Sequence, residues 1–495
     1  MNRYETLAHA LAEEIRAGRV PIGSKLPSLR QITTQHGVSQ STVLSAYYLL
    51  EEWGLIRAEE RSGYFVTPGA AVSPAPEAHR PSLAESARVD ISDLVFSVLQ
   101  ATKHVDAVPL GSAFPSPLLF PLSRLAKSLT QGVRSLNPWS TVADLPPGNE
   151  QLRRQIALRY VGAGMASPVD EIVVTNGALE ALNLSLMAVT RPGDIVVVES
   201  PGFYAALQAI ERLDLRALEV PVDPLTGLDL DALAQALEKH PVKACWLMTN
   251  FQNPTGATLT DTKKKALVEL LAAHDVPLIE DDVYQELHFD KARPLPAKAF
   301  DTHGLVMHCG SFSKTLAPGY RIGWVSAGRF AERIQRLKLM TTLSASIPAQ
   351  AGIADFLQHG AYDKHLRQLR AALNTQMASM QQALRRYMPE GTRWTLPAGG
   401  YFVWIELPLA IDAMALHRRA IEHGISLAPG PIFSATHAFQ NCIRLNFGHP
   451  WSPQLEESIR KLGEIVADPL VRLSKTTEGA TAGTPRRGGV PAGKS

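Results

Sequence analysis

The chain of 495 residues is too long for one hydrophobic core, so its length predicts two or three domains. Its formal net charge of only +2 provides no global basic field, so any binding of nucleic acid must come from a local surface. The three cysteines are widely spaced and form no CxxC pair, which favours a reducing cytosol and predicts no metal site. No apolar run is long enough to span a bilayer, and we expect a cytoplasmic protein without a membrane partner.

Three short helices are predicted at the N-terminus. Apolar residues recur at helical spacing from Leu7 to Ile15, and glycines and a proline then end the pattern. Ser28 and Gln31 have the spacing of a capping box, so a second helix begins there and ends near Gly37. Ser39 is expected to cap the third helix. The two later helices therefore meet across a tight turn.

The third helix and the chain after it indicate a winged helix-turn-helix. The helix has an apolar stripe (Val43, Ala46, Tyr47 and Leu50), and its first turn is polar. Residues 55–58 and 64–67 are predicted to form two strands around a hairpin tip at 60–63. This arrangement favours DNA binding through the major groove over a small oligomerisation or ligand-binding module. The candidate DNA-binding residues are Lys25, Arg30, Ser39, Gln40, Ser41 and Thr42.

Three stretches of this region, 26–30, 37–39 and 62–66, resemble the DNA-binding domain of GntR-family regulators. The resemblance implies a winged helix-turn-helix domain over residues 1–67 whose partner is double-stranded DNA. Gln40 and Ser41 stand where that family often has an arginine. The base-reading contacts are therefore left open.

A linker is predicted over residues 68–90, which are rich in alanine, proline and serine. From there to residue 470, strands alternate with helices, and this alternation predicts an α/β domain. The last third carries long amphipathic helices within 350–387 and strands at 401–407 and 442–447. Residues 471–495 are expected to form a disordered tail.

A lysine motif in the α/β domain indicates a site for a phosphorylated aldehyde. Lys314 follows Ser311 and Ser313, and Arg321 lies seven residues further on. The lysine supplies an amine for a Schiff base, and the arginine supplies a planar fork for a phosphate. Pyridoxal phosphate needs both groups.

Two further motifs follow apolar runs and supply what this cofactor still lacks. Asp281 comes at the end of one run, where a carboxylate can keep a pyridine nitrogen protonated, and the phenol of Tyr284 can reach a ring hydroxyl. Asn253 begins the turn Asn-Pro-Thr-Gly after another run, and its amide can bind the same hydroxyl. An Asn-Pro pair is also simply a common turn.

A tight turn and an aromatic residue complete the candidate site. Gly177 and Ala178 precede a predicted helix at 179–189, whose free N–H groups can hold a phosphate. Phe203 follows a strand at 195–199 and can stack on a pyridine ring, although core packing would explain it too.

The joint order of these motifs, ending in Arg444, resembles the fold-type I aminotransferases. The resemblance implies a large α/β domain with a mainly parallel sheet and a smaller α+β domain. It implies three catalytic residues (Lys314 as the Schiff-base lysine, Asp281 and Tyr284) and Arg444 as the clamp for a substrate carboxylate. It also implies that the phosphate is bound by Ser311 and Arg321, with Ser313, Gly177 and Ala178 beside them, and that Phe203, Asn253 and Tyr284 contact the ring.

The whole arrangement resembles the MocR-type subgroup of GntR regulators. This implies a regulator that binds pyridoxal 5'-phosphate and an amino acid or amine, and that forms a homodimer. Ala143 stands where many aminotransferases have a tyrosine that reaches the partner's phosphate. One other interpretation stays open, a working aminotransferase with a fused DNA-binding module. A structural protein would require loss of Lys314 or Asp281, and neither residue is lost.

Overall fold

The structure is a computed structural model, and it describes residues 3–16, 20, 24–52, 55–59, 63–66, 75–79, 81, 83, 85–101, 107–140, 145–165, 167–290, 292–359 and 361–472. The predictions for the hairpin tip at 60–62, for Ala143 and for residues 473–495 fall outside this part of the chain. Among the described residues, no helix has the length and apolarity needed to cross a membrane.

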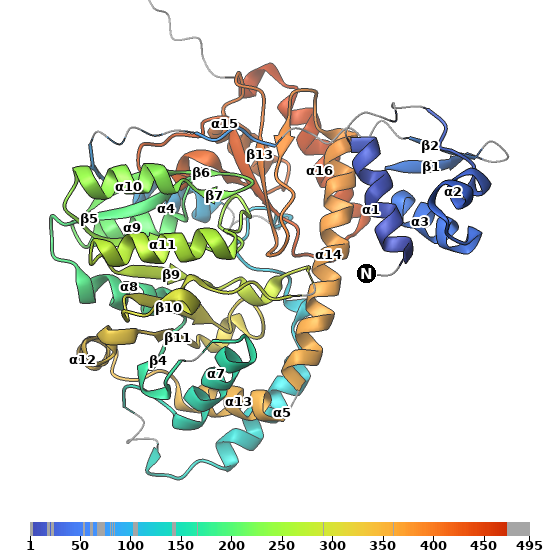
Figure 1. Cartoon of the computed structure of the whole chain (residues 1–495). Helices are drawn as coiled ribbons and strands as arrows, with labels where there is room; N and C mark the ends of the chain where they lie inside the picture. The colour runs from blue at the N-terminus through green and yellow to red at the C-terminus, as the bar shows by residue number, and fades with distance from the viewer. Residues whose placement is uncertain are drawn as a thin grey trace, which may run out of the picture.

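The N-terminal domain has the predicted helices and strands: α1 (Arg3–Arg16), α2 (Leu29–His36), α3 (Gln40–Glu52), β1 (Ile56–Glu59) and β2 (Gly63–Val66). The capping box is confirmed, because Ser28 Oγ accepts from the Gln31 N–H and the Gln31 side chain accepts from the Ser28 N–H at 2.7 Å. The predicted stripe of α3 is buried in a core of this domain's own residues. In Figure 1 the domain stands to one side of the rest of the molecule.

A large twisted sheet forms the centre of the second domain. Its strands are β3 (Ala87–Arg88), β4 (Ile172–Thr175), β5 (Ile195–Ser200), β6 (Arg216–Asp223), β7 (Gly227–Leu228), β8 (Val242–Leu247), β9 (Leu278–Asp281), β10 (Val306–Ser311) and β11 (Gly323–Ser326). The order is β3-β6-β5-β8-β9-β10-β11-β4, with β7 paired to β6. Strands β6, β5, β8, β9 and β10 are parallel, so their carboxyl ends meet at one edge.

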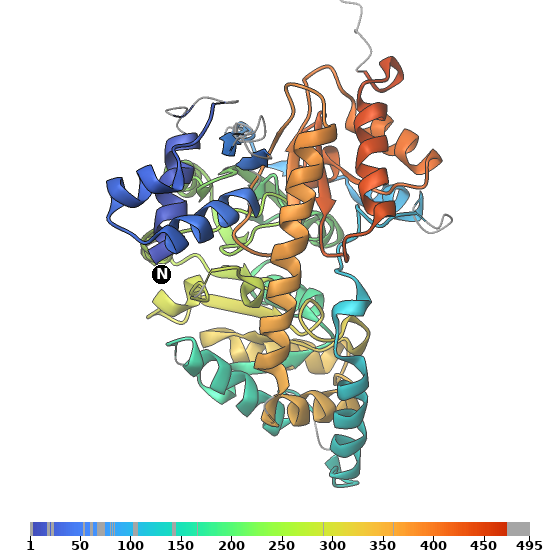
Figure 2. The ribbon, with the colours of Figure 1, turned by 90° about the vertical axis from the view of Figure 1, so that its right-hand side faces the viewer.

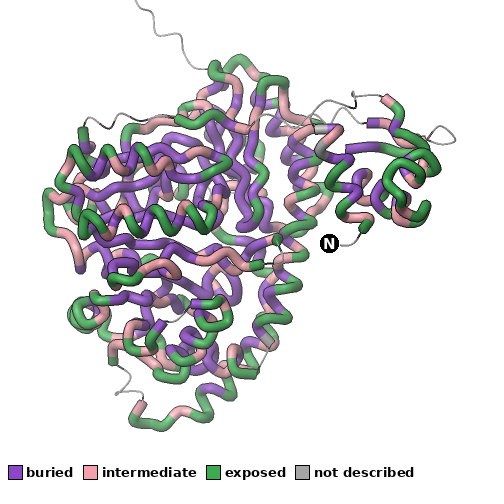
Figure 3. The backbone as a smooth tube through the Cα atoms, viewed as in Figure 1, coloured by how far each residue is buried: buried purple, intermediate pink, exposed green. Residues whose placement is uncertain are grey.

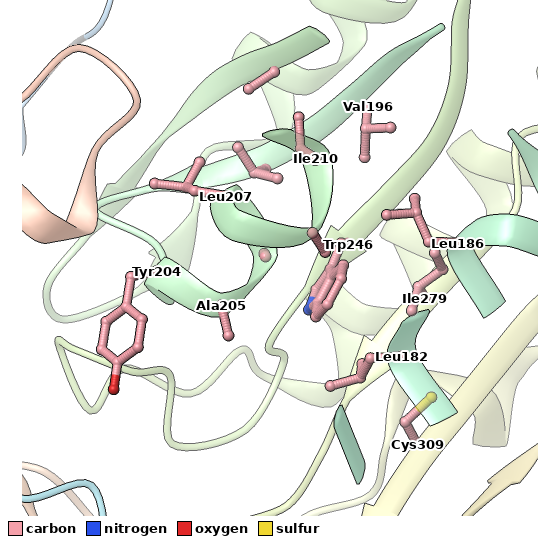
Figure 4. Packing of buried hydrophobic residues seen from close by; sticks show 14 of the residues in the cluster. Leu182, Leu186, Val196, Tyr204, Ala205, Leu207, Ile210, Trp246, Ile279 and Cys309 are labelled. Carbon is pink, nitrogen blue, oxygen red and sulfur yellow. The ribbon is translucent and has the colours of Figure 1, made fainter. Parts of the chain in front are cut away.

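Helices cover both faces of this sheet, as a mainly parallel sheet requires. They are α4 (Ser92–Ala101), α5 (Leu122–Arg134), α7 (Glu150–Gly162), α8 (Ala178–Val189), α9 (Tyr204–Arg212), α10 (Leu230–Lys239), α11 (Asp261–Ala273), α12 (Ala331–Thr341) and α13 (Ile347–Gln358). Figure 4 shows how Trp246 of β8 packs among Leu182 of α8, Ile279 of β9 and Ile210 of α9. Figure 3 shows the buried strands between helices whose outer faces are exposed.

The smaller C-terminal domain is α+β, as predicted. It contains α14 (Ala361–Tyr387), β12 (Arg393–Trp394), β13 (Phe402–Glu406), α15 (Ala413–Glu422), β14 (Ala428–Pro429), β15 (Cys442–Asn446) and α16 (Pro453–Val466). Its antiparallel sheet has the order β12-β13-β15-β14, and α14 runs along the molecule from one domain to the other (Figure 2). Val471, predicted to begin the tail, is only 1% exposed because it packs in this domain's core.

Candidate functional site

A cavity of about 230 Å³ lies at the carboxyl edge of the large sheet. Strands β9 and β10 end beside it, which places the motifs that follow these strands at one position in space. Most of the predicted cofactor residues line it: Ala178, Phe203, Asp281, Tyr284, Ser311, Ser313, Lys314 and Arg321. Gly177, Asn253 and Arg444 lie behind this lining, in contact with residues of the site.

Lys314 presents its amine to this cavity. Its Nζ donates to the carbonyl oxygen of Ala113 at 2.7 Å and lies 3.8 Å from the ring centroid of Phe114. The pKa of Lys314 is lowered to about 7, mainly because burial disfavours the charged form; the charge of Arg444 lowers it further, while Asp281 opposes the change. A large share of the amine is therefore uncharged near neutral pH, and an uncharged amine is the form that attacks a carbonyl carbon.

Asp281 ends β9 and is 1% exposed. Its Oδ1 has no hydrogen-bond partner among the described residues, although unpaired buried carboxylate oxygens are rare. Burial, helped by the charge of Asp282, raises the pKa of Asp281 to about 7, and the charge of Lys314 opposes this. A protonated ring nitrogen would satisfy this oxygen and favour its charge, so the carboxyl fits pyridoxal phosphate.

The predicted phosphate subsite lies at the start of α8. Gly177 has φ +82°, a backbone conformation that favours glycine, and a Cβ there would also press on the guanidinium of Arg321. Arg321 Nη1 donates to Ser313 Oγ at 3.1 Å, and the Ser313 N–H donates to Ser311 Oγ at 3.0 Å. Among the residues that the structure describes, no side chain caps the start of α8. A guanidinium, two hydroxyls and uncapped helix N–H groups thus come together, which is a suitable donor set for a phosphate.

Arg444 is buried on β15, beside this cavity. Its Nη1 donates to Asn253 Oδ1 at 2.8 Å, and its Nη2 donates to the carbonyl oxygen of Gly111 at 2.9 Å. Its guanidinium carbon lies 4.1 Å from the ring centroid of Phe402. Arg444 Nε and Asn253 Nδ2 have no hydrogen-bond partner within the part of the chain that the structure describes. The two bonds use only two of the five N–H donors of Arg444, so the remaining donors, Nε among them, are left for a ligand carboxylate.

Tyr284 and Phe203 form part of the aromatic wall. The phenol of Tyr284 is 2% exposed and packs edge-on against Tyr401, with 5.4 Å between ring centroids. Burial raises the pKa of Tyr284, so the phenol keeps its proton and can donate it to a hydroxylate. Phe203 is half-buried against Tyr204, with 4.8 Å between ring centroids.

The structure adds lining residues that the sequence reasoning missed: Ala113, Phe114, Tyr204 and Met248. Tyr204 directly follows Phe203, so its aromatic ring gave a usable signal. Ala113 and Phe114 gave none, because they come from a loop about 200 residues before Lys314 in the sequence.

The candidate DNA-binding residues are exposed to different degrees. Lys25, Arg30, Gln40 and Ser41 are exposed, and Thr42 is half-buried. The hydroxyl of Ser39 accepts from the Thr42 N–H at 3.2 Å and is also bonded to the hydroxyls of Ser41 and Thr42, so it caps α3. We expect Gln40 and Ser41, rather than Ser39, to face base edges.

We expect the protein without its cofactor to take up pyridoxal phosphate faster as the pH rises through about 7. Lys314 loses its proton in this interval, and the uncharged fraction of a group with that pKa rises about tenfold between pH 6 and pH 8. The measurement is the rate of visible colour development after mixing. A small oxyamine, which is uncharged throughout this pH interval, corrects for ionisation of the aldehyde itself. If the corrected rate does not change between pH 6 and pH 8, Lys314 is not the amine that reacts with the aldehyde.

The class of the protein follows from comparisons with known families. Residues 136–462 match the family "Aminotransferase class I and II", and residues 3–66 match "Bacterial regulatory proteins, gntR family". The chain therefore belongs to the class I and II aminotransferase family in its larger part, with a GntR helix-turn-helix domain before it. This combination makes it a member of the MocR-type subgroup of the GntR regulators, as the sequence analysis predicted.

Relatives that span both domains are regulators. The chain is 49% identical to YdcR of Escherichia coli (strain K12), an uncharacterized HTH-type transcriptional regulator, over 95% of this chain and 100% of YdcR. It is 26% identical to the HTH-type transcriptional regulator NorG of Staphylococcus aureus, over 88% of this chain and 98% of NorG. The protein is thus an HTH-type transcriptional regulator with an aminotransferase-like domain.

The aminotransferase-like part also resembles solved enzymes. A multiple substrate aminotransferase from Thermococcus profundus matches with a TM-score of 0.71 and 31% identity, over 75% of this chain and 94% of the enzyme. The kynurenine aminotransferase of Pyrococcus horikoshii, solved with PMP, gives the same score and identity over 76% and 94%. These matches confirm the predicted fold.

Proposed function

We propose that this protein is a pyridoxal-phosphate-dependent transcription regulator that senses an amino acid or amine in its aminotransferase-like domain. The observation that carries this proposal is the convergence of Lys314, Asp281 and Arg321 on one cavity, in a chain that also has a GntR helix-turn-helix domain. We propose that the protein acts in the cytoplasm, where it meets double-stranded DNA.

Each side chain has a defined task toward the cofactor. When bound, pyridoxal phosphate supplies an aldehyde that captures primary amines and a ring that accepts electrons. Lys314 would hold the aldehyde carbon, and Asp281 would bind the proton on the ring nitrogen. Asn253 and Tyr284 would bind the ring hydroxyl. Phe203 would pack on the ring, and the phosphate would be held by Ser311, Ser313 and Arg321 with the backbone of Gly177 and Ala178.

Lys314 would hold the cofactor aldehyde until an amino compound binds. Lys314 then has a free amine inside the cavity, and its low pKa lets this amine accept or release a proton near neutral pH. The fork of Arg444 would bind the carboxylate of an amino acid, a bidentate task that lysine performs less well.

Arg444→Ala should weaken the response to amino acids while the cofactor colour is retained. Loss of a buried, charge-assisted pair costs about 2 to 5 kcal/mol, so at least about thirtyfold more amino acid should be needed. The measurement is the change in visible absorbance as an amino acid is added. Arg444→Lys keeps the positive charge but loses the planar pair of N–H donors that binds a carboxylate at two points. An amine without a carboxylate should change the absorbance of the parent and of both variants equally. A normal response of Arg444→Ala to amino acids would make an amine the better ligand class.

The proposal is tested by a screen of amino compounds with two readouts in parallel. Visible absorbance reports binding at Lys314, and affinity for a DNA fragment selected by the full-length protein from genomic DNA reports regulation. We expect at least one compound to change both. If compounds change the absorbance and none changes the DNA affinity, the sensing role is wrong.

An active aminotransferase is the second candidate function. It is favoured by the presence of the full residue set, including Lys314 and Arg444, which catalysis and sensing would both use. Steady turnover of an amino acid with a keto acid, together with an absence of sequence preference on genomic DNA, would support this function instead.

We also propose a homodimer. Large apolar side chains are exposed in and around α5, a surface that water disfavours and a second subunit would cover: Leu118, Leu122, Val133 and Trp139. Contact with the cofactor phosphate across the dimer is not part of this proposal, because Ala143 lies outside the described residues.

A further inference from the structure

Residues 75–79, which follow the DNA-binding domain, lie against the small domain. The backbone N–H of Glu77 donates to Glu406 Oε2 at 2.9 Å, and the Glu77 carboxylate pairs with the guanidinium of Arg393. Pro76 is buried. This part of the predicted linker is therefore docked on the protein and does not lie free in solvent.

The docking points belong to the sheet that carries Arg444. Arg393 on β12 stands opposite Glu406 on β13, so the two partners of Glu77 are neighbours across one strand pair. On the same strand β13, Trp404 stands opposite Arg444 on β15. A shift of this sheet would therefore move Arg444 and the docked segment together, because interstrand hydrogen bonds make the sheet a single rigid unit.

The next part of the chain is attached to the large domain. The carbonyl oxygen of Leu83 is bonded to His240 Nε2 at 2.8 Å, and Arg216 Nε donates to Ser86 Oγ at 2.7 Å. Strand β3 then pairs with β6 of the large sheet. This part of the chain is thus attached to the small domain through residues 75–79 and to the large domain through Leu83, Ser86 and β3.

Arg444 bridges the same two domains at the site. It belongs to the small sheet, and its Nη1 donates to Asn253, which follows β8 of the large sheet. A ligand carboxylate on Arg444 would attach to the same guanidinium that ties the small sheet to Asn253, so it would act on this tie between the domains. The chain between residue 75 and β3 has attachments on both sides of the same boundary, so it would sense a change in their relative position.

We propose that the surface formed by Arg393 and Glu406 holds residues 75–79 and thereby transmits ligand binding at Arg444 to the DNA-binding domain. This inference rests on the proposed function and adds its route. From Val66 to Ala75 the chain advances nine residues and can span at most about 32 Å. Without the docking, the first attachment of the chain after Val66 would be at Leu83, seventeen residues later. A chain of that length can span up to about 60 Å. Docking therefore sets how freely the DNA-binding domain can be positioned, and so its effective concentration at a DNA half-site.

The test separates ligand binding from its transmission. The probe is aminooxyacetate, an oxyamine that condenses with aldehydes and carries a carboxylate for Arg444. Two quantities are measured for the cofactor-loaded, full-length protein. The first is the visible absorbance with and without the probe. The second is the affinity for the selected DNA fragment, expressed as the ratio between its values with and without the probe. The parent ratio should be at least about fivefold, in the usual range of coupling between sites.

The variants should lower the ratio of DNA affinities to different degrees. The Glu77 side chain is 76% exposed, so its ion pair is weak and its removal should reduce the ratio only in part. Arg393→Ala and Glu77→Ala should have the same effect, and their combination no more, because they remove one shared pair. Arg393→Ala with Glu406→Ala also removes the acceptor for the Glu77 N–H, and should bring the ratio close to one. All variants should keep the absorbance response.

Arg386→Ala is the matched control, because Arg386 also forms an exposed ion pair in the small domain, with Glu456, and should leave the ratio at the parent value. An unchanged ratio in Arg393→Ala with Glu406→Ala overturns the inference, as does an equal loss in Arg386→Ala. A parent that shows the absorbance change but no change in DNA affinity overturns it too. If the probe leaves the parent's absorbance unchanged, the assignment of Lys314 to the cofactor site is wrong, and so is the inference that depends on it.

Discussion

Lys314→Ala should leave the purified protein colourless, whereas the parent protein should be yellow. The colour requires a covalent bond between the Lys314 amine and the cofactor aldehyde, because this bond extends the conjugated system of the ring into the visible range. The variant has no amine at this place in the cavity, so the visible band should be lost completely. The measurement is the absorbance spectrum of both proteins after incubation with pyridoxal phosphate and removal of the excess.

A surface lysine is the control for this prediction. Lys265 lies on the exposed side of α11 with 63% of its side chain exposed, and Lys265→Ala should keep the full visible band. The Lys314→Ala variant should also bind the selected DNA fragment, yet its DNA affinity should not respond to amino compounds. A visible band of normal intensity in Lys314→Ala would show that another amine holds the aldehyde, and the assignment of the site would be wrong.

The sequence predicted those parts of the site that lie next to strand ends. Asp281 and Lys314 each follow an apolar run, and the structure places both at the carboxyl edge of the sheet because these runs are neighbouring parallel strands. Such runs can be recognised locally, and the rule that ligands bind at this edge supplies the rest. The capping box at Ser28 was equally local and is confirmed.

The missed parts depend on contacts between distant segments. Ala113 accepts a hydrogen bond from Lys314 although 201 residues separate them, and nothing in the sequence around Ala113 indicates this partner. The hydrogen bond between Arg444 and Asn253 joins two residues that are 191 positions apart in the sequence. The segment around Glu77 has the composition of a linker, and its docking depends on Arg393 and Glu406, more than 300 residues later. Such pairings follow from the packing of whole domains, which local patterns do not determine.

The full-length protein should bind a repeated or palindromic DNA site with high specificity, and a fragment of residues 1–67 should bind the same site far more weakly. The N-terminal domain has its own core, so the fragment can fold. It carries seven acidic and seven basic residues, and a single copy has little general attraction for DNA. Two copies on a dimer would bind paired half-sites, and such tethering typically strengthens binding about 10²- to 10⁴-fold without any new contact.

Two substitutions divide this binding into its parts. Arg30→Ala removes an exposed cation, so it should weaken binding to all sequences and make the affinity less dependent on salt. Gln40→Ala should mainly relax the sequence preference, since its amide is placed to contact a base edge at the start of α3. Affinities for the selected fragment and for a shuffled fragment, measured at several salt concentrations, distinguish the two effects. If the isolated domain binds the selected fragment as tightly as the full-length protein does, the aminotransferase-like body adds nothing to DNA recognition, and the dimeric regulator proposed here is wrong.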